Sequence, residues 1–257
     1  MENSSYYQQD RTHADWIFLS PHPDDAALSC GGLIWELARS GARVEIWTLC
    51  AGEIPPGGLT PFAKTLHARW GTGLATIQDR RREDQAAWRE LGAAGRFFDL
   101  PDCVYRRLPS GDPVVSGEDD LWREIQPGEQ ALVKQISVWW RAGLRPSVQL
   151  VAPLALGGHV DHRLARAAAE ELSLPLLYYA DYPYALRTAF NPDTELGTGW
   201  VSEAHPVSAA GVEAWQRAVA QYTSQISTFW QSLDEMRAAM ADYAASRYGT
   251  MMWKHAA

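Results

Sequence analysis

The sequence predicts an α/β fold: a Rossmann-like sandwich in which helices cover both faces of a mostly parallel sheet. Three observations predict it. Short apolar runs alternate with segments of helical spacing along most of the 257 residues, a pattern typical of βαβ units. Hydrophobic residues make up 46% of the chain, which is enough for a large core. The two most unusual polar motifs each follow an apolar run, where parallel sheets place their ligand sites.

The first expected strand is WIFLS at 16–20, a continuous apolar run bounded by prolines, as buried parallel strands are. A helix is expected over 26–42, ending at Gly41, a typical C-terminal cap. Further strands are expected at 43–50, 96–102, 147–153 and 174–184, and further helices at 77–91, at 120–143 and after the glycine pair 157–158.

Two long stretches rich in glycine and proline, 51–75 and 103–118, are expected to be irregular connections. Loops of this length inside a compact domain are usually functional. Trp70 lies in the first stretch and is a candidate platform for a flat or sugar-like ligand, with core packing as the alternative.

We expect a single domain over residues 1–257, with a loose tail at 1–14 and a helical C-terminal region at 200–257. The net charge of −8 argues against nucleic acid or an anionic membrane as the main partner. No apolar run approaches the roughly 20 residues of a spanning helix, and the polar start lacks a signal-peptide layout. Three cysteines without a CxxC pair indicate reduced thiols and a cytoplasmic location. A homo-oligomer is compatible with these features.

Directly after the first expected strand, the sequence PHPDD places His22 beside the adjacent carboxylates Asp24 and Asp25. Pro23 favours an extended backbone at His22, so the aspartates fall at the N-terminus of the next helix. Negative charge is favoured there by about 0.3–1 kcal/mol. A helix cap would account for one aspartate, but not for the pair and the histidine, so the motif indicates a functional site.

A second cluster, HVDH, follows Gly157 and Gly158 at the end of another expected strand and contains His159, Asp161 and His162. Its alternative interpretation is a helix start capped by Asp161, with both histidines in solvent. Because a parallel sheet gathers its strand-to-helix junctions at one edge, we expect the two motifs to lie close together.

Two neutral imidazoles and one carboxylate form a good three-ligand site for a divalent metal, most simply Zn²⁺, and leave the fourth position to water. Iron or cobalt can use the same ligands. Zinc lowers the pKa of water to about 7 and polarises a carbonyl. A spare carboxylate can then accept a proton, and a spare histidine can protonate a departing amine. The residues alone leave open which aspartate binds the metal.

PHPDD followed downstream by HVDH, on this α/β pattern, resembles the PIG-L/LmbE-like zinc-dependent N-deacetylases over most of residues 16–185. The resemblance implies that His22, Asp25 and His162 are the zinc ligands and that Asp24 is the general base.

The resemblance also implies that His159 stabilises the oxyanion or protonates the leaving amine, with Asp161 as the partner that orients it. Gly157 stands where some members carry a tyrosine, so Tyr184 or Tyr182 is the candidate to reach the oxyanion in its place.

Sugar-binding positions of the family are matched by Arg80 or Arg81 and by Asp102. For the arginines, a solvated charged face with i,i+4 ion pairs is the alternative. For Asp102, at the end of an expected strand, the alternative is a turn-forming aspartate.

We therefore expect a hydrolase that removes an N-acetyl or other small N-acyl group from an amino-sugar conjugate by attack of metal-activated water on the amide carbonyl. One alternative is an amidase of a larger thiol or peptide conjugate. Another is a non-catalytic sugar- or nucleotide-binding module, although no GxGxxG follows the first expected strand.

Overall fold

A computed structural model describes residues 15–70, 76–187, 196–246 and 249–256. Within them, seven strands form one sheet in the order β3-β2-β1-β4-β5-β7-β6. The first five strands in this order are parallel to one another. Strand β7 pairs antiparallel with β5, and β6 pairs antiparallel with β7. The strands are β1 (Asp15–Ser20), β2 (Arg43–Thr48), β3 (Ala94–Phe97), β4 (Gln149–Pro153), β5 (Leu176–Tyr179), β6 (Trp200–His205) and β7 (Thr250–His255).

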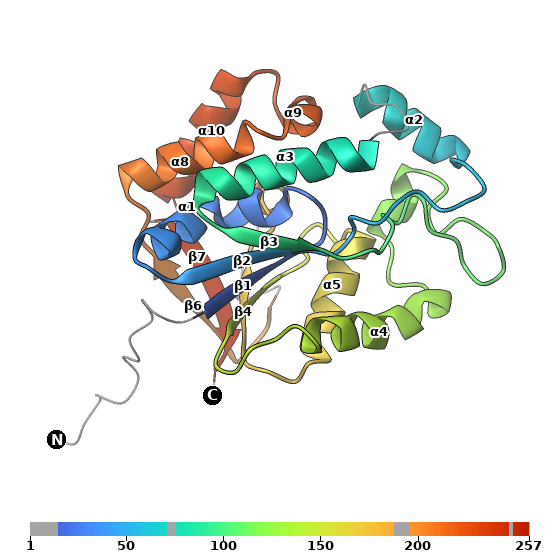
Figure 1. Ribbon diagram of the computed structural model, residues 1–257, viewed down its shortest axis with the longest axis horizontal. Helices are drawn as coiled ribbons and strands as arrows, with labels where there is room; N and C mark the ends of the chain where they lie inside the picture. The colour runs from blue at the N-terminus through green and yellow to red at the C-terminus, as the bar shows by residue number, and fades with distance from the viewer. Residues whose placement is uncertain (1–14, 71–75, 188–195, 247–248, 257) are drawn as a thin grey trace.

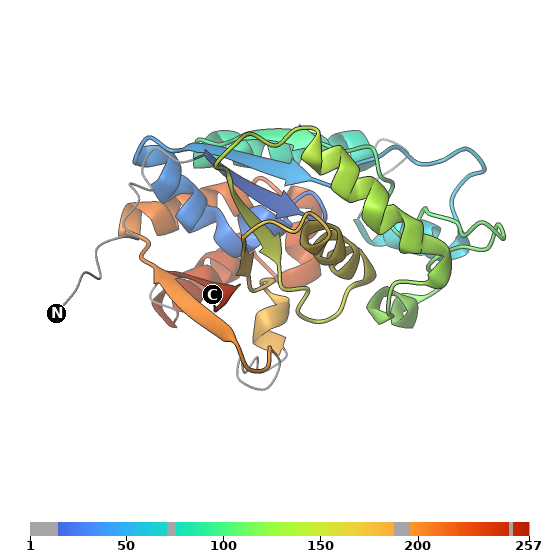
Figure 2. The ribbon, with the colours of Figure 1, turned by 90° about the horizontal axis from the view of Figure 1, so that it is seen from below.

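Helices cover both faces of this sheet (Figures 1 and 2). Three helices pack together on one face: α1 (Asp25–Arg39), α3 (Thr76–Leu91) and α8 (Ala209–Val219). Two pack on the other: α4 (Gln130–Arg141) and α5 (Val160–Glu170). The other helices of the described residues are α2 (Pro61–Trp70), η2 (Glu118–Trp122), η3 (Pro127–Glu129), α6 (Tyr184–Arg187), α9 (Thr223–Phe229) and α10 (Leu233–Ser246). The predicted α/β sandwich is confirmed.

Strand β1 shows why its sequence is a continuous apolar run. Trp16 and Phe18 pack into the core beneath α1, α3 and α8, whereas Ile17 and Leu19 pack into the core beneath α4 and α5. All four are at most 1% exposed. A strand buried on both faces has no polar side, so the alternation typical of half-exposed strands is absent.

Four expected elements differ from the structure. The strand expected over 174–184 is confined to β5, Leu176–Tyr179, and α6 begins at Tyr184. Helix α2 lies within the stretch 51–75, which was expected to be irregular. The helix expected over 120–143 begins only at Gln130, because Pro127 lacks an N–H group and would clash inside a continuous helix. Strand β3 begins before the expected start at 96 and ends at Phe97, well before the expected end at 102. Pro101, inside the expected range, cannot donate to a strand ladder.

The C-terminal region 200–257 contains helices α8, α9 and α10, and also two strands that the sequence reading did not predict. Strand β7 pairs with β5, and β6 pairs with β7 at the sheet edge. The side chains of β6 are half-buried or exposed, so its sequence carries no apolar run. The expected tail 1–14 lies outside the described residues.

The three cysteines are free and buried, as expected. None of the helices in the described part of the chain combines the length and apolar character that a bilayer crossing requires.

Candidate metal centre and active site

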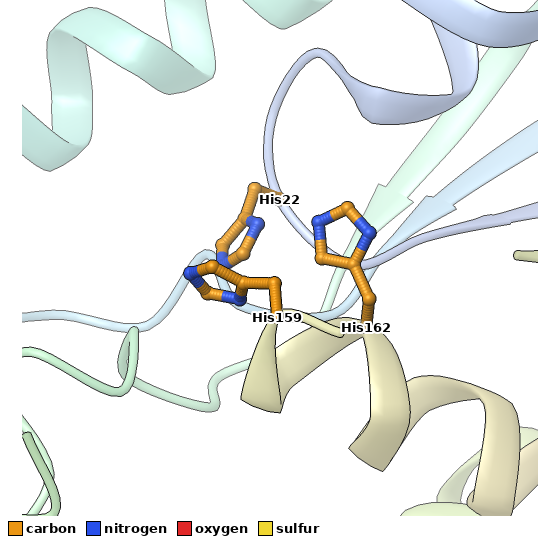
Figure 3. A group of neighbouring side chains, drawn as sticks. All are labelled: His22, His159 and His162. Atoms are coloured by element: carbon orange, nitrogen blue, oxygen red, sulfur yellow. The ribbon is translucent and has the colours of Figure 1, made fainter. Parts of the chain in front are cut away.

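The two polar motifs meet at one edge of the sheet. Because β1 and β4 are parallel neighbours, the chain leaves both strands at the same edge. His22 comes from the loop after β1, and His159 and His162 come from the start of α5 (Figure 3). The three ring centroids are 5.0, 5.2 and 5.4 Å apart. The structure thus brings His22 together with His159 and His162, which lie 137 and 140 residues further along the chain.

The three expected ligands meet at the carboxylate of Asp25. The Oδ2 atom of Asp25 lies 3.2 Å from Nδ1 of His22 and 3.3 Å from Nε2 of His162. Two ligand atoms on a tetrahedral zinc ion are separated by about 3.3 Å, given metal–ligand bonds of about 2.0–2.1 Å. All three residues are buried. His22 and His162 also form, with His159, a group whose ligand atoms all lie within 4.8 Å of one another. Two imidazoles and one carboxylate are a donor set that suits zinc or a related divalent transition metal.

Each of these two histidines has a carboxylate behind it. Nε2 of His22 lies 3.0 Å from Oδ2 of Asp161, and Nδ1 of His162 lies 2.6 Å from Oδ1 of Asp181. In both rings, this contact uses the nitrogen that does not face Asp25. Carboxylates in this position fix the orientation and tautomer of metal-binding histidines.

Asp181 was missed in the sequence reading. It follows β5, at the same sheet edge as the two motifs, and its Oδ2 accepts a hydrogen bond from the backbone N–H of Leu156. It is only 1% exposed. A carboxylate placed directly beyond a buried parallel strand was the available signal, the same signal that singled out Asp24 and Asp25.

The structure places Asp161 differently from the expected role as the partner of His159. The Asp161 carboxylate contacts His22, and only its backbone N–H reaches His159, donating to Nδ1 at 3.3 Å. The physical reason is that His159 occupies the N-cap of α5, where a side chain accepts from the second helical amide.

This contact determines the tautomer of His159. Since Nδ1 accepts a hydrogen bond, the proton of the neutral ring sits on Nε2. Burial, together with the neighbouring rings of His22 and His162, holds the pKa of His159 well below its usual value of 6.5. His159 is therefore a neutral Nε2–H donor near pH 7.

Asp24 sits beside the candidate ligands in an unusual backbone conformation, with φ 125°. It holds the N-cap position of α1, but its side chain makes no capping hydrogen bond, so the simple cap interpretation does not describe it. Nη2 of Arg80 lies 3.4 Å from Oδ2 of Asp24 and donates to the carbonyl of Pro23. Burial, opposed by Arg80 and reinforced by Asp25, raises the pKa of Asp24 to about 8. A strained backbone at a buried carboxylate is typical of functional sites.

A cavity of about 220 Å³ opens over these residues. His22, Asp24, Asp25 and His159 lie among its lining residues. One wall is aromatic: Trp122 lies 5.6 Å from the ring of His159 and 5.8 Å from that of Tyr184, and Tyr184 lies 6.4 Å from Phe229, all between centroids.

Of the expected substrate-binding residues, Arg80, Asp102 and Tyr184 line the cavity. The Oδ2 atom of Asp102 lies 3.6 Å from Nε2 of His22, and its Oδ1 accepts from the N–H of Val104. Arg80 is engaged with Asp24, so its charge acts on the candidate base as well as on the cavity.

Arg81 is not among the described residues that line the cavity. Its Nε donates to the carbonyl of Ala51, and its Nη1 pairs with Glu53, so it anchors the loop after β2. Trp70 ends α2, and its side chain lies outside the described residues. The sequence reading missed Trp122 and Phe229, because they come from η2 and α9, far from either motif.

Comparison with known proteins identifies the family. A family model described as PIG-L, GlcNAc-PI de-N-acetylase, matches residues 17–173. The chain belongs to the PIG-L family. The resemblance indicated by the two sequence motifs is confirmed.

Three curated proteins are similar to this PIG-L family member. A 2′-N-acetylparomamine deacetylase of Niallia circulans is 30% identical over 189 residues, which cover 66% of this chain and 67% of that protein. Its counterpart from Streptomyces fradiae is 29% identical over 180 residues, 66% of this chain and 57% of that one. A 1D-myo-inositol 2-acetamido-2-deoxy-alpha-D-glucopyranoside deacetylase of Corynebacterium diphtheriae is 26% identical, covering 72% and 62%. The chain thus spans roughly three fifths of the length of the latter two.

Two solved structures are similar to this protein along nearly its whole chain. A teicoplanin deacetylase in its zinc-inhibited form is 27% identical, with a TM-score of 0.79, over 93% of this chain and 97% of that one. The A40926 pseudoaglycone deacetylase is 28% identical, with a TM-score of 0.72, over 96% and 100%.

Proposed function

We propose that this PIG-L family member is a metal-dependent hydrolase that removes an N-acetyl or other small N-acyl group from an amino-sugar conjugate. The observation that carries the proposal is the position of Asp25 Oδ2, between Nδ1 of His22 and Nε2 of His162. Asp24 and His159 lie beside this triad on the same cavity. The similar proteins at 26% identity or more that are described above are named as deacetylases, which supports the same reaction.

His22, Asp25 and His162 would hold the metal. When bound there, zinc supplies a Lewis acid that polarises the amide carbonyl and makes water nucleophilic near neutral pH. Asp24, not a ligand, accepts a proton from the attacking water in its ionised form. A metal cation bound beside it would favour this form and offset the raised pKa of Asp24. His159 donates from Nε2 to the carbonyl oxygen as that oxygen gains negative charge. The C–N bond then breaks, the proton held by Asp24 passes to the leaving nitrogen, and acetate and a free amine result.

Recognition of the sugar is assigned to the cavity walls. The faces of Trp122 and Tyr184 offer an apolar surface on which a sugar ring can stack, and Asp102 offers a carboxylate for hydroxyl groups. Relatives named for N-acetylparomamine and for an inositol-linked acetamido sugar favour a glucosaminyl conjugate. The second candidate is an amidase of a larger conjugate; relatives named as deacetylases of teicoplanin and of the A40926 pseudoaglycone bear on the size of the conjugate but not on an amidase reaction.

We propose zinc as the metal. We also propose that the enzyme acts on a small molecule in the cytoplasm. We also propose that residues 200–257 belong to the same domain as the site, because β7 pairs with β5 and α8 packs on α1 and α3. One relative is described in a zinc-inhibited form, so metal is best added in stoichiometric amounts.

The test is acetate release from a panel of substrates. The protein is stripped with a chelator, reloaded with one equivalent of zinc, and assayed with N-acetylglucosamine, N-acetylparomamine, an N-acetylglucosaminyl inositol and an N-acylated glycopeptide. We expect acetate and free amine to appear together, to vanish on chelation and to return on reloading. A zinc-loaded protein that binds an acetylated sugar but releases no acyl group from any substrate would contradict the proposal and favour a binding module.

A further inference from the structure

Arg106 is a buried guanidinium that connects two carboxylates. Its Nη1 lies 2.7 Å from Oδ1 of Asp161, and its Nε donates to Oε1 of Glu129 at 2.6 Å. The side chains of all three residues are at most 6% exposed. Arg106 comes from the connection after β3, and Glu129 lies directly before α4, so neither belongs to a motif in the sequence.

Stability alone is a weak explanation for this group. Burying ionised side chains is costly, and replacing buried ion pairs with apolar residues is often neutral or stabilising. The buried charges of Arg106 and Glu129 are therefore better explained by the residue that they hold in place, which is Asp161. Asp161 divides its oxygens: Oδ1 faces Arg106, and Oδ2 faces Nε2 of His22 and accepts from the N–H of Cys103. Arg106 attracts Oδ1 by its charge, because Oδ1 has no hydrogen-bond partner among the described residues. This attraction leaves Oδ2 to face His22 and Cys103.

We propose that Arg106 is a positioning residue for the metal site. It holds Asp161 so that Oδ2 engages Nε2 of His22, which leaves Nδ1 of His22 facing Asp25. Glu129 holds Arg106 in turn. The inference rests on the proposed function, because the orientation of His22 matters for chemistry only if His22 is a ligand.

Arg106 can also be reached from a different side of the molecule. Together with Glu129 it lines a second cavity, of about 440 Å³, whose other lining residues include the exposed Arg107 and Pro109. Neither Arg106 nor Glu129 is among the described residues that line the candidate active site. Within the described part of the chain, Nη2 of Arg106 and Oε2 of Glu129 have no hydrogen-bond partner. A small guanidinium ion can therefore occupy the place of a truncated Arg106 without competing with substrate.

The test is chemical rescue of Arg106→Ala. Zinc affinity is measured by competition with a chromophoric chelator, without substrate, and kcat and KM are measured on the best substrate of the panel. We expect zinc affinity to fall about 10–100-fold, as for outer partners of metal ligands, and kcat to fall with little change in KM. Methylguanidinium should restore both, whereas urea, which is planar but uncharged, should restore neither.

Arg107→Ala is the matched control. Arg107 is exposed, lines the same cavity and donates to the carbonyl of Gly111. We expect this variant to match the unmodified protein and to be insensitive to methylguanidinium.

Unchanged zinc affinity and kcat in folded Arg106→Ala would overturn the proposal, and so would a loss that methylguanidinium does not reverse, since that loss would reflect packing. If Arg106→Ala does not fold, Glu129→Gln decides, because it keeps the shape and removes the charge that holds Arg106. A lowered zinc affinity would support the proposal, and an unchanged affinity would overturn it. Because zinc affinity is measured without substrate, a protein that cleaves nothing in the panel would end the proposed function and still test Arg106.

Discussion

The Nδ1 atom of His162 lies 2.6 Å from the Oδ1 atom of Asp181, and both side chains are at most 1% exposed. The contact directs Nε2 of His162 toward Asp25. Burial disfavours the charged ring, but Asp25 and Asp181 outweigh it and raise the pKa of His162 to about 10. A metal must displace a proton from this ring, so metal affinity is expected to fall as the pH is lowered.

Replacing Asp181 with asparagine should weaken metal binding by about 10–100-fold. The amide has one acceptor oxygen, whereas Asp181 accepts from both His162 and the N–H of Leu156. The measurement is chelator competition, with the circular dichroism spectrum as a check on folding. The control is Glu170→Gln, a change of an exposed side chain on α5, the helix that carries His162. An affinity within twofold of the unmodified protein would remove Asp181 from the metal site.

Alanine substitutions should separate the two adjacent aspartates. Asp24→Ala is expected to keep the metal and to lose about 10²–10⁴-fold in kcat, because only the proton acceptor is removed. Asp25→Ala is expected to lose metal and turnover together, since its Oδ2 lies between both histidines. Metal content by emission spectroscopy and acetate release are measured on the same samples. Equal metal loss in the two variants would reverse or abolish this division of roles.

Trp122→Ala should raise the KM for an amino-sugar substrate by roughly 2- to 10-fold, the value of one aromatic contact of about 0.5–1.5 kcal/mol. The change in kcat should be smaller, because the contact of Trp122 with His159 is an edge contact between two rings and no hydrogen bond. Trp122→Phe should recover most of the affinity. Steady-state kinetics decide the matter: an unchanged KM in Trp122→Ala would exclude the aromatic wall from substrate binding.

The buried carboxyl of Asp84 should make stability depend on pH. Burial raises its pKa from 3.8 to about 7, although Tyr222 and Thr48 donate hydrogen bonds to it. The folded state then keeps a proton that the unfolded state loses near pH 4. The free energy of unfolding should therefore fall by about 4 kcal/mol as the pH rises from about 4 to about 7.

Asp84→Asn cannot ionise and should make the pH dependence over this window shallower by the contribution of Asp84. Asp24, whose pKa is also raised, contributes in the same direction in both proteins. Urea unfolding of both proteins at a series of pH values gives the two curves. Parallel curves would mean that Asp84 is already ionised in the folded protein at low pH.

Much of the fold could be predicted because the buried strands carry their own signal. WIFLS is a short, continuous apolar run bounded by prolines, which favours a buried parallel strand. Strand β6 could not be found this way, because its residues are half-exposed and its partner β7 lies 45 residues or more along the chain. Helix α2 was missed because glycines and prolines surround it.

The candidate site divides along the same line. His22, Asp24 and Asp25 could be placed, because one short segment positions them at the end of a strand. Arg106 and Trp122 could not, because irregular connections carry them to the site, and no local periodicity predicts where such connections fold. Asp161 was predicted to be in the site but with a different neighbour, since the cap of α5 depends on the backbone geometry of one turn.

The position of β7 has a consequence for how the molecule is assembled. Although it is made after β6, it lies between β5 and β6, so β6 has no place on the sheet until β7 arrives. A nascent chain halted before Thr250 would leave the β5 ladder at Tyr178 and Tyr179 open to other chains. Truncation at this point would therefore produce an aggregation-prone chain with an open sheet edge instead of a slightly shortened enzyme.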